Sequence, residues 1–265
     1  MKEIHGLNTR LMVSIWPNMR SGGSNHHEMM DGGYLLGNQS TYDPFQQEAR
    51  ELYWKQAEEG LFRHGIDAWW CDCTEPFEAD WKGAVKLEPE ERMLINTEEA
   101  KKYIDPEFIN VYSLLHSHGI YEAQRRTTES KRVVNLTRSS FAGQHRYSTI
   151  TWSGDIAATW DTFRKQIPAG LNFCITGEPY WTLDIGAFFV GGKSKWSRWC
   201  SDAGIPAPWV LAGDFDGGCE DLGYRELYVR WFQYGAFLPM FRAMARTRLG
   251  KYGGLESLAV CFTIL

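Results

Sequence analysis

The sequence predicts an α/β protein, and within that class a (β/α) barrel, with a doubly wound parallel sheet as the alternative. Short apolar runs alternate with helical stretches about five times along the chain, and this pattern is typical of a parallel sheet covered by helices. The alternation contains no glycine fingerprint of a dinucleotide-binding fold, which favours the barrel. With 265 residues, 43% of them hydrophobic, the chain is long enough to bury a full-sized core.

The expected strands are short apolar runs. The first, 11–16, is continuous and stops at Pro17, as a buried parallel strand would. The other expected strands are of similar length, and each is followed by a polar or glycine-containing segment. The expected set of strands is 11–16, 66–71, 133–137, 148–152 and 172–176.

The expected helices lie between these strands. The stretch 44–63 places apolar residues such as Leu52, Tyr53 and Leu61 at roughly helical spacing. Further helices are expected at 88–94, 107–118, 159–171 and 222–237. The segments 22–42 and 75–87 are expected to be loops, the first because it is polar and rich in glycine.

Composition excludes several classes of function. The net charge of -5 gives no support for a nucleic-acid binder. No run approaches the roughly 18 apolar residues of a membrane span, and the first residues have no apolar core of a signal peptide. We therefore expect a cytoplasmic protein with no nucleic-acid or membrane partner. The six cysteines contain no CxxC pair, so we expect reduced thiols, no metal and no cofactor.

Polar side chains gather just after the expected strands. Because the carboxyl ends of barrel strands open on one face, these side chains are expected to converge there. Any one of these aspartates is more simply explained as the cap of the next helix, but the whole set, in a chain with 12 tryptophans, favours carboxylate chemistry at a site with aromatic walls. The set comprises Asp72, Glu75, Arg138, Asp155, Glu178 and Asp184.

Four segments in order resemble glycoside hydrolase family 31. Residues 69–76, Trp-Trp-Cys-Asp-Cys-Thr-Glu-Pro, resemble its nucleophile motif. Residues 138–147 and then 152–155, Trp-Ser-Gly-Asp, resemble its arginine and acid/base segments. Residues 177–188 resemble its next strand end, with Ala187 where the family usually has glycine. Four motifs in the family's order make coincidence very improbable.

The resemblance implies an incomplete (β/α)8 barrel. The family has this barrel behind a β-sandwich, and the run 11–16 resembles its third barrel strand. We therefore expect roughly strands 3 to 8 in a partial catalytic domain over 1–243, without an aspartate that the earlier strands supply. We expect residues 244–265 to have no match in the family, which continues with His-Gly. One base inserted after the Ala243 codon could restore such a sequence, so we hypothesise a frameshifted tail.

The resemblance also implies a retaining mechanism with two aspartates. Asp72 would be the nucleophile, and Asp155 the general acid and then the general base. Retention requires their carboxyl groups about 5–5.5 Å apart, which their positions on different strands would allow. Glu75 is expected to support the nucleophile loop, with Cys71 and Cys73 packing beside Asp72.

Further residues would bind the sugar. Arg138 would hold sugar hydroxyls and help to keep nearby carboxylates ionised. Aromatic side chains would form the walls of the pocket, and Asp184 would support its floor. The expected substrate-binding residues are Trp16, Trp70, Arg138, Trp152, Asp184 and Phe188.

The substrate implied is an oligosaccharide with an α-linked terminal xylosyl or glucosyl residue. The Trp-Trp-x-Asp-x-Thr-Glu-Pro form at 69–76 looks more like the bacterial α-xylosidases than the α-glucosidases. An α-glucosidase or an α-transglycosylase stays an alternative. So does a non-catalytic remnant or a sugar-binding fragment, because missing pocket walls would cost the positioning that catalysis needs.

Overall fold

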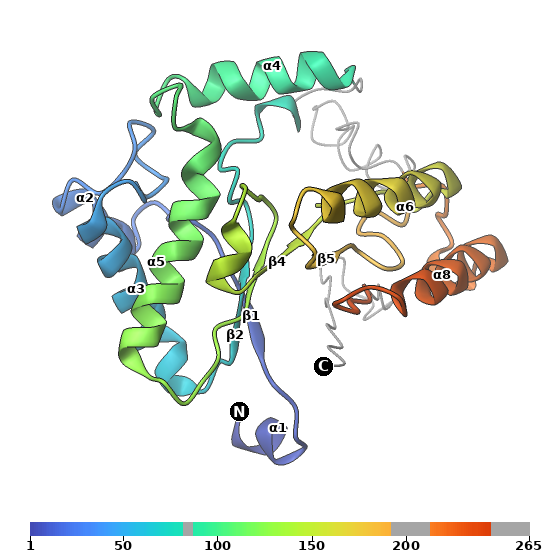
Figure 1. Ribbon diagram of the computed structural model, residues 1–265, viewed down its shortest axis with the longest axis horizontal. Helices are drawn as coiled ribbons and strands as arrows, with labels where there is room; N and C mark the ends of the chain where they lie inside the picture. Colours follow the sequence, from blue (N-terminus) through green and yellow to red (C-terminus); the bar gives the residue numbers. More distant parts are fainter. Residues whose placement is uncertain (82–86, 192–212, 245–265) are drawn as a thin grey trace. The chain divides into compact units, whose positions relative to one another are not determined.

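The computed structural model describes residues 1–81, 87–191 and 213–244. The chain forms two compact units, coloured along the sequence in Figure 1. The first unit consists of Met1–Ala79 and Glu90–Thr151, and the second of Asp80–Pro89 and Trp152–Leu265.

The strands confirm the predicted parallel sheet. β1 to β4 pair in parallel, and the sheet order of all five described strands is the order of the sequence. Four of the five predicted apolar runs form strands, each close to its predicted place. The strands are β1 (Met12–Ile15), β2 (Ala68–Cys71), β3 (Asn135–Thr137), β4 (Thr149–Trp152) and β5 (Trp181–Thr182).

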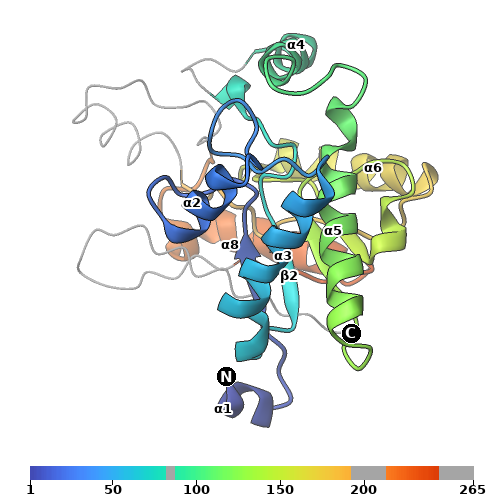
Figure 2. The same cartoon turned by 90° about the vertical axis from the view of Figure 1, so that its left-hand side faces the viewer.

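Helices follow the strands, as the alternation predicts. In the first unit α3 and α5 lie side by side in both views of Figures 1 and 2. The helices are α1 (Lys2–Gly6), α2 (Ser24–Asp31), α3 (Gln47–Gly60), α4 (Pro89–Ala100), α5 (Tyr112–Thr127), α6 (Trp160–Ile175) and α8 (Leu222–Gly235). Single 3₁₀ turns are η1 (Phe62–His64), η2 (Ala79–Trp81), η3 (Ile109–Val111), η4 (Gln144–Tyr147) and η6 (Gly218–Glu220).

The core of the first unit lies between the sheet and helices α3 and α5. Trp69 of β2 is wholly buried there, and its indole N–H donates to Gln124 of α5 over 2.8 Å. Trp54 of α3 donates in the same way to Thr127 of α5 over 3.0 Å. A buried tryptophan is stabilised when its indole N–H has a hydrogen-bond acceptor. These two hydrogen bonds attach α5 to β2, the strand that precedes Asp72, and attach α3 to α5.

The second unit has a core of its own. Leu183 and Ile185, which follow β5, are wholly buried against Leu227 and Trp231 of α8. Helix α8 begins at the N-cap Asp221, whose carboxylate accepts from the backbone N–H of Gly223 over 2.8 Å. Helix α6 begins at Thr159, whose hydroxyl oxygen accepts from the N–H of Thr162. These caps satisfy backbone donors that the first helical turn leaves without partners.

Two predicted elements are wrong. The loop expected at 22–42 contains helix α2, which buries Met29 and His26 although most of its residues are polar. The strand expected at 172–176 is the last turn of α6. There Ile175 is 84% exposed, so this apolar run is not a buried strand. A short apolar run cannot be assigned to strand or helix by its pattern alone.

The remaining differences concern boundaries. Helix α4 continues to Ala100, beyond the predicted 88–94, and α5 continues to Thr127, beyond the predicted 107–118. The expected loop 75–87 contains η2, and its residues 82–86 lie outside the described parts. The expected tail 244–265 lies outside them too, apart from Met244, whose N–H donates to Ile185 O. Among the described helices, none is long and apolar enough to cross a membrane.

Candidate active site

The carboxyl ends of the first four strands lie in one row. Ile15 pairs with Cys71, Cys71 with Thr137, and Thr137 with Thr151. The residue after each of the first three is Trp16, Asp72 or Arg138. The sheet register therefore brings these predicted site residues to the same edge, as expected for a parallel barrel.

Alternation along β2 decides which face the site residues share. Trp69 and Cys71 belong to the core under α3 and α5. Because successive side chains of a strand point to opposite faces, Trp70 and then Asp72 point away from those helices. Trp70 is half-buried, and Trp16 after β1 is 50% exposed. Trp70 and Asp72 thus lie on the face that would be the barrel interior.

Asp72 is held by its own backbone and by Arg138. Its N–H donates to Ile15 O over 3.0 Å, and its carboxylate accepts from the N–H of Cys73 over 2.8 Å. The Arg138 guanidinium lies 3.4 Å from the same carboxylate oxygen, with 7% of its side chain exposed. The carboxylate is therefore fixed in place at the end of β2, next to a buried positive charge.

Arg138 also pairs with two further carboxylates of the loop that follows β2. Its Nη2 forms ion pairs with Glu75 and Glu78, and it donates to the sulfur of Cys73 over 3.1 Å. Glu75 was predicted to support this loop. Sequence reasoning missed Glu78, although Asp72, Glu75 and Glu78 recur at every third residue, a signal that could have found it.

Burial is the main electrostatic influence on Glu75. It raises the pKa of this carboxyl group above its usual value, and the negative charge of Asp72 raises it further. The positive charge of Arg138 acts in the opposite direction and does not fully offset them. Glu75 thus holds a proton at higher pH than an exposed glutamate does.

Asp184 of the second unit is wholly buried and forms an ion pair with Arg242, which is also wholly buried. The guanidinium carbon of Arg242 lies 5.1 Å from the ring centroid of Trp152, within the range of a cation–π interaction. Sequence reasoning proposed Trp152 and Asp184 but missed Arg242, which joins them. No motif at Arg242 signals this contact, because 58 residues separate it from Asp184.

Asp155 and Phe188 lie on two backbone segments that meet within the second unit. The N–H of Phe188 donates to Ile156 O over 2.9 Å, and the N–H of Ala158 donates to Phe189 O over the same distance. Asp155 is half-buried at the start of the first segment. The structure thus places Phe188 beside the chain that carries Asp155.

The described residues show no site for a metal ion formed by three or more His, Cys, Asp or Glu side chains. Cys71 and Cys73 are buried and form no disulfide within the described residues. Cys71 lies in β2, whereas Cys73 lies beyond the strand with a φ of +55°. The expectation that both are packing residues beside Asp72 fits Cys71, while Cys73 additionally contacts Arg138.

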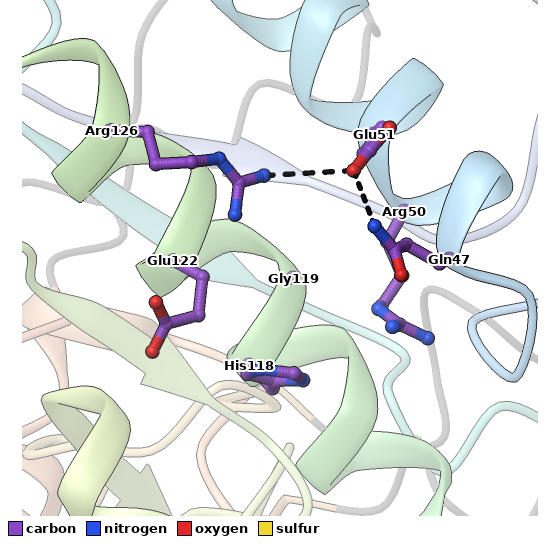
Figure 3. A pocket seen from close by; sticks show the side chains of 7 residues that line it. All are labelled: Gln47, Arg50, Glu51, His118, Gly119, Glu122 and Arg126. Carbon is purple, nitrogen blue, oxygen red and sulfur yellow. Dashed lines mark hydrogen bonds and ion pairs between the residues drawn. The ribbon is translucent and has the colours of Figure 1, made fainter.

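A cavity of about 240 Å³ lies between α3 and α5. Figure 3 shows its lining, in which the Glu51 carboxylate lies between Gln47 and Arg126. His118 and Glu122 of α5 complete the polar wall. This cavity contains none of the predicted site residues, and its acidic and basic side chains balance one another. The Asp72 cluster therefore stays the candidate active site.

Comparison with known proteins shows the family of the chain. The family model for the glycosyl hydrolases family 31 TIM-barrel domain matches residues 1–251. An α-xylosidase of Saccharolobus solfataricus is 38% identical over 242 residues, which are 91% of this chain and 28% of that protein. The chain therefore spans little more than a quarter of that relative.

Solved structures give the same result. A family 31 α-xylosidase from Xanthomonas citri has a TM-score of 0.68 and 32% identity, over 91% of this chain and 25% of that one. A family 31 α-xylosidase from a soil metagenome, complexed with xylose, has a TM-score of 0.68 and 27% identity, over 98% and 35%. Because the family model covers far more than half of its residues, the chain belongs to glycoside hydrolase family 31, through the TIM-barrel domain of that family.

Proposed function

We propose that this chain carries catalytic residues of a retaining α-glycosidase that releases terminal α-linked xylosyl residues from oligosaccharides. The observation that carries the proposal is the Asp72 carboxylate, held at the end of β2 by the Cys73 N–H and by Arg138. A fixed, partly exposed carboxylate at a strand end of this barrel is suited to nucleophilic attack. The α-xylosidase relatives support the xylosyl substrate.

Asp72 and Asp155 divide the chemistry. In the first step an Asp72 oxygen bonds to the anomeric carbon, the glycosidic bond breaks, and Asp155 gives its proton to the departing oxygen. In the second step Asp155 takes a proton from water, the water oxygen bonds to the anomeric carbon, and the ester to Asp72 breaks. Two inversions give net retention.

Arg138 serves the nucleophile in this proposal. Its ion pairs to Asp72, Glu75 and Glu78 hold the guanidinium within the carboxylate cluster. A rigid planar cation of this kind fixes the direction of a carboxylate better than a lysine would. Glu75 and Glu78 in turn position Arg138, while Trp16 and Trp70, which are both partly exposed, supply flat apolar surface for sugar rings. Trp152 is 1% exposed and packs on Arg242.

The test measures turnover of 4-nitrophenyl α-xyloside and α-glucoside by the 265-residue chain and by Asp72→Asn. We expect the xyloside to be preferred and Asp72→Asn to lose about 10⁴-fold in kcat. Asp31→Asn at the exposed end of α2 is the matched control and keeps its activity. Turnover by Asp72→Asn at the control's rate, or none by the unaltered chain, would contradict the proposal.

Asp155 is tested by the leaving group. Asp155→Ala removes the proton donor, so substrates with poor leaving groups lose the most in the first step, while a nitrophenolate departs without help. We expect kcat/KM of this variant to fall far more for an unactivated xylosyl disaccharide than for the nitrophenyl xyloside. An equal loss for both substrates would remove Asp155 from the acid role.

A further inference from the structure

A chain of buried hydroxyl groups lies behind the loops that carry Asp72 and Arg138. The Thr74 and Thr137 hydroxyls are 2.9 Å apart, and the Ser113 hydroxyl of α5 lies 3.3 Å from that of Thr137. Gln144 of η4 donates from Nε2 to Ser113 over 2.8 Å and to Ser117 over 3.1 Å. All five side chains belong to residues with at most 1% exposure.

These hydrogen bonds converge on one backbone carbonyl. Ser139 O accepts from the Thr137 hydroxyl over 3.0 Å and from the Ser113 hydroxyl over 2.8 Å. Gln144 Nε2 lies 3.2 Å from the same oxygen, but its two protons serve the shorter bonds to Ser113 and Ser117. With the Thr137 proton used in this way, the Thr74 hydroxyl is the donor to Thr137. Every hydroxyl proton of Thr74, Thr137 and Ser113 is then used once, so the arrangement has a single consistent direction.

The position of this network relates it to the candidate active site. Thr74 is two residues beyond Asp72, and Thr137 and Ser139 flank Arg138 in sequence. The network thus holds both chain segments whose side chains meet in the Arg138–Asp72 pair, 3.4 Å apart. These buried hydrogen bonds hold the two segments in place, because breaking one of them leaves a polar group without water.

We propose that Thr74, Thr137, Ser113 and Gln144 form a positioning network that fixes the Arg138 guanidinium against the Asp72 carboxylate. This inference rests on the proposed function for its effect on catalysis, but the structural clamp itself can be measured separately. None of the four side chains takes part in the chemical steps. Loss of the clamp therefore lowers kcat through misplacement of Asp72 and leaves sugar binding nearly unchanged.

Thr137→Val tests the clamp, because it keeps the shape of the side chain and removes the hydroxyl at the centre of the network. The matched control is Thr149→Val in neighbouring β4, whose buried hydroxyl has no hydrogen-bond partner among the described residues. Thr137→Ser restores the hydroxyl and is the rescue variant. Ser113→Ala removes another hydroxyl of the network and replaces Thr137→Val if that variant does not fold.

The first readout needs no activity. Cys73 lies between Asp72 and Thr74 and is 3% exposed, so its alkylation by iodoacetamide reports release of this loop. Mass spectrometry of the tryptic peptide, with fragmentation to separate Cys73 from Cys71, gives the rate. We expect Thr137→Val to raise this rate about 10-fold, the size of change that losing one buried hydrogen bond produces, and Thr137→Ser and Thr149→Val to match the unaltered chain.

The second readout is the split between kcat and KM for 4-nitrophenyl α-xyloside. We expect Thr137→Val to lower kcat about 10- to 100-fold, with KM changed by less than about 3-fold. A folded Thr137→Val with unaltered kcat and Cys73 rate overturns the inference, and so do equal effects from Thr149→Val. If the unaltered chain shows no turnover, the proposed function fails, while the Cys73 rates still decide whether the clamp exists.

Discussion

Two buried arginines of the described chain hold carboxylates in different ways. Arg138 lies among three acidic side chains of one loop and one strand end. Arg242 pairs with Asp184, and the indole of Trp152 covers its guanidinium. A buried pair contributes little net stability, but removing one partner leaves an uncompensated charge in the core.

Replacement of Arg242 tests this asymmetry. We expect Arg242→Met to lower the free energy of unfolding by about 3–5 kcal/mol, because the buried Asp184 then loses the positive charge of Arg242. The double variant Asp184→Leu, Arg242→Met removes both charges and recovers most of the loss. Urea unfolding followed by tryptophan fluorescence measures both. A double variant no more stable than Arg242→Met would contradict this explanation.

His116 predicts a pH dependence of stability. It is wholly buried beside the Tyr42 hydroxyl, 2.6 Å from Nδ1, and burial lowers its pKa from 6.5 to about 3. Below pH 6.5 the unfolded chain binds a proton that the folded chain does not bind, so acid favours unfolding. We expect His116 to cost about 2 kcal/mol of stability between pH 7.5 and pH 5.

His116→Gln removes this titration. The free energy of unfolding of this variant, measured by urea at each pH, should fall less than that of the unaltered chain between these two pH values. His27→Gln on the exposed face of α2 is the control and keeps the full pH dependence. Parallel curves for His116→Gln and the unaltered chain would show that His116 does not titrate as its burial implies.

Single residues differ in how far the sequence predicts them. The places of Asp72 and Arg138 followed from strand ends and from motifs, because parallel strands bring their carboxyl ends together. Glu78 and Arg242 were missed, because their roles follow from their ion-pair partners, Arg138 and Asp184, and these pairs are visible only in the fold. Such contacts depend on side-chain packing across 58 to 60 residues of sequence, which no local pattern records.

Elements were predicted where their pattern was unambiguous. The strands at β1 to β4 were found because each is a short apolar run with a clear end. Helix α2 was missed because its buried side, Met29 and His26, is narrow and half of it is polar. The predicted helix ended at residue 171, and the apolar run after it was assigned to a strand. Helix α6 instead continues through this run to Ile175.

The N-cap of α6 gives a prediction for a whole element. The Thr159 hydroxyl oxygen accepts from the Thr162 N–H over 3.0 Å at the N-terminus of α6. We expect Thr159→Ala to lower the free energy of unfolding by about 1 kcal/mol, and Thr159→Ser to leave it nearly unchanged. Urea unfolding measures both, and equal losses for the two variants would exclude a capping role.

For the molecule as a whole, the order of the elements was the most predictable property. Alternating strands and helices predict a parallel sheet, and the five described strands follow one another in the order of the sequence. Their register then determines which residues share an edge. It could not be predicted from composition or periodicity, because it depends on how each helix packs against its strand, as Trp69 does through Gln124.

The backbone conformation and the side-chain contact of Cys73 favour different substitutions at this position. Its φ of +55° is a left-handed conformation that costs a residue with a side chain about 1–2 kcal/mol relative to glycine. Its sulfur, however, is a partner of Arg138. A library selected for thermal stability alone would therefore drift toward glycine at position 73. A library selected for turnover would retain a side chain there. The two selections would therefore favour different residues at position 73.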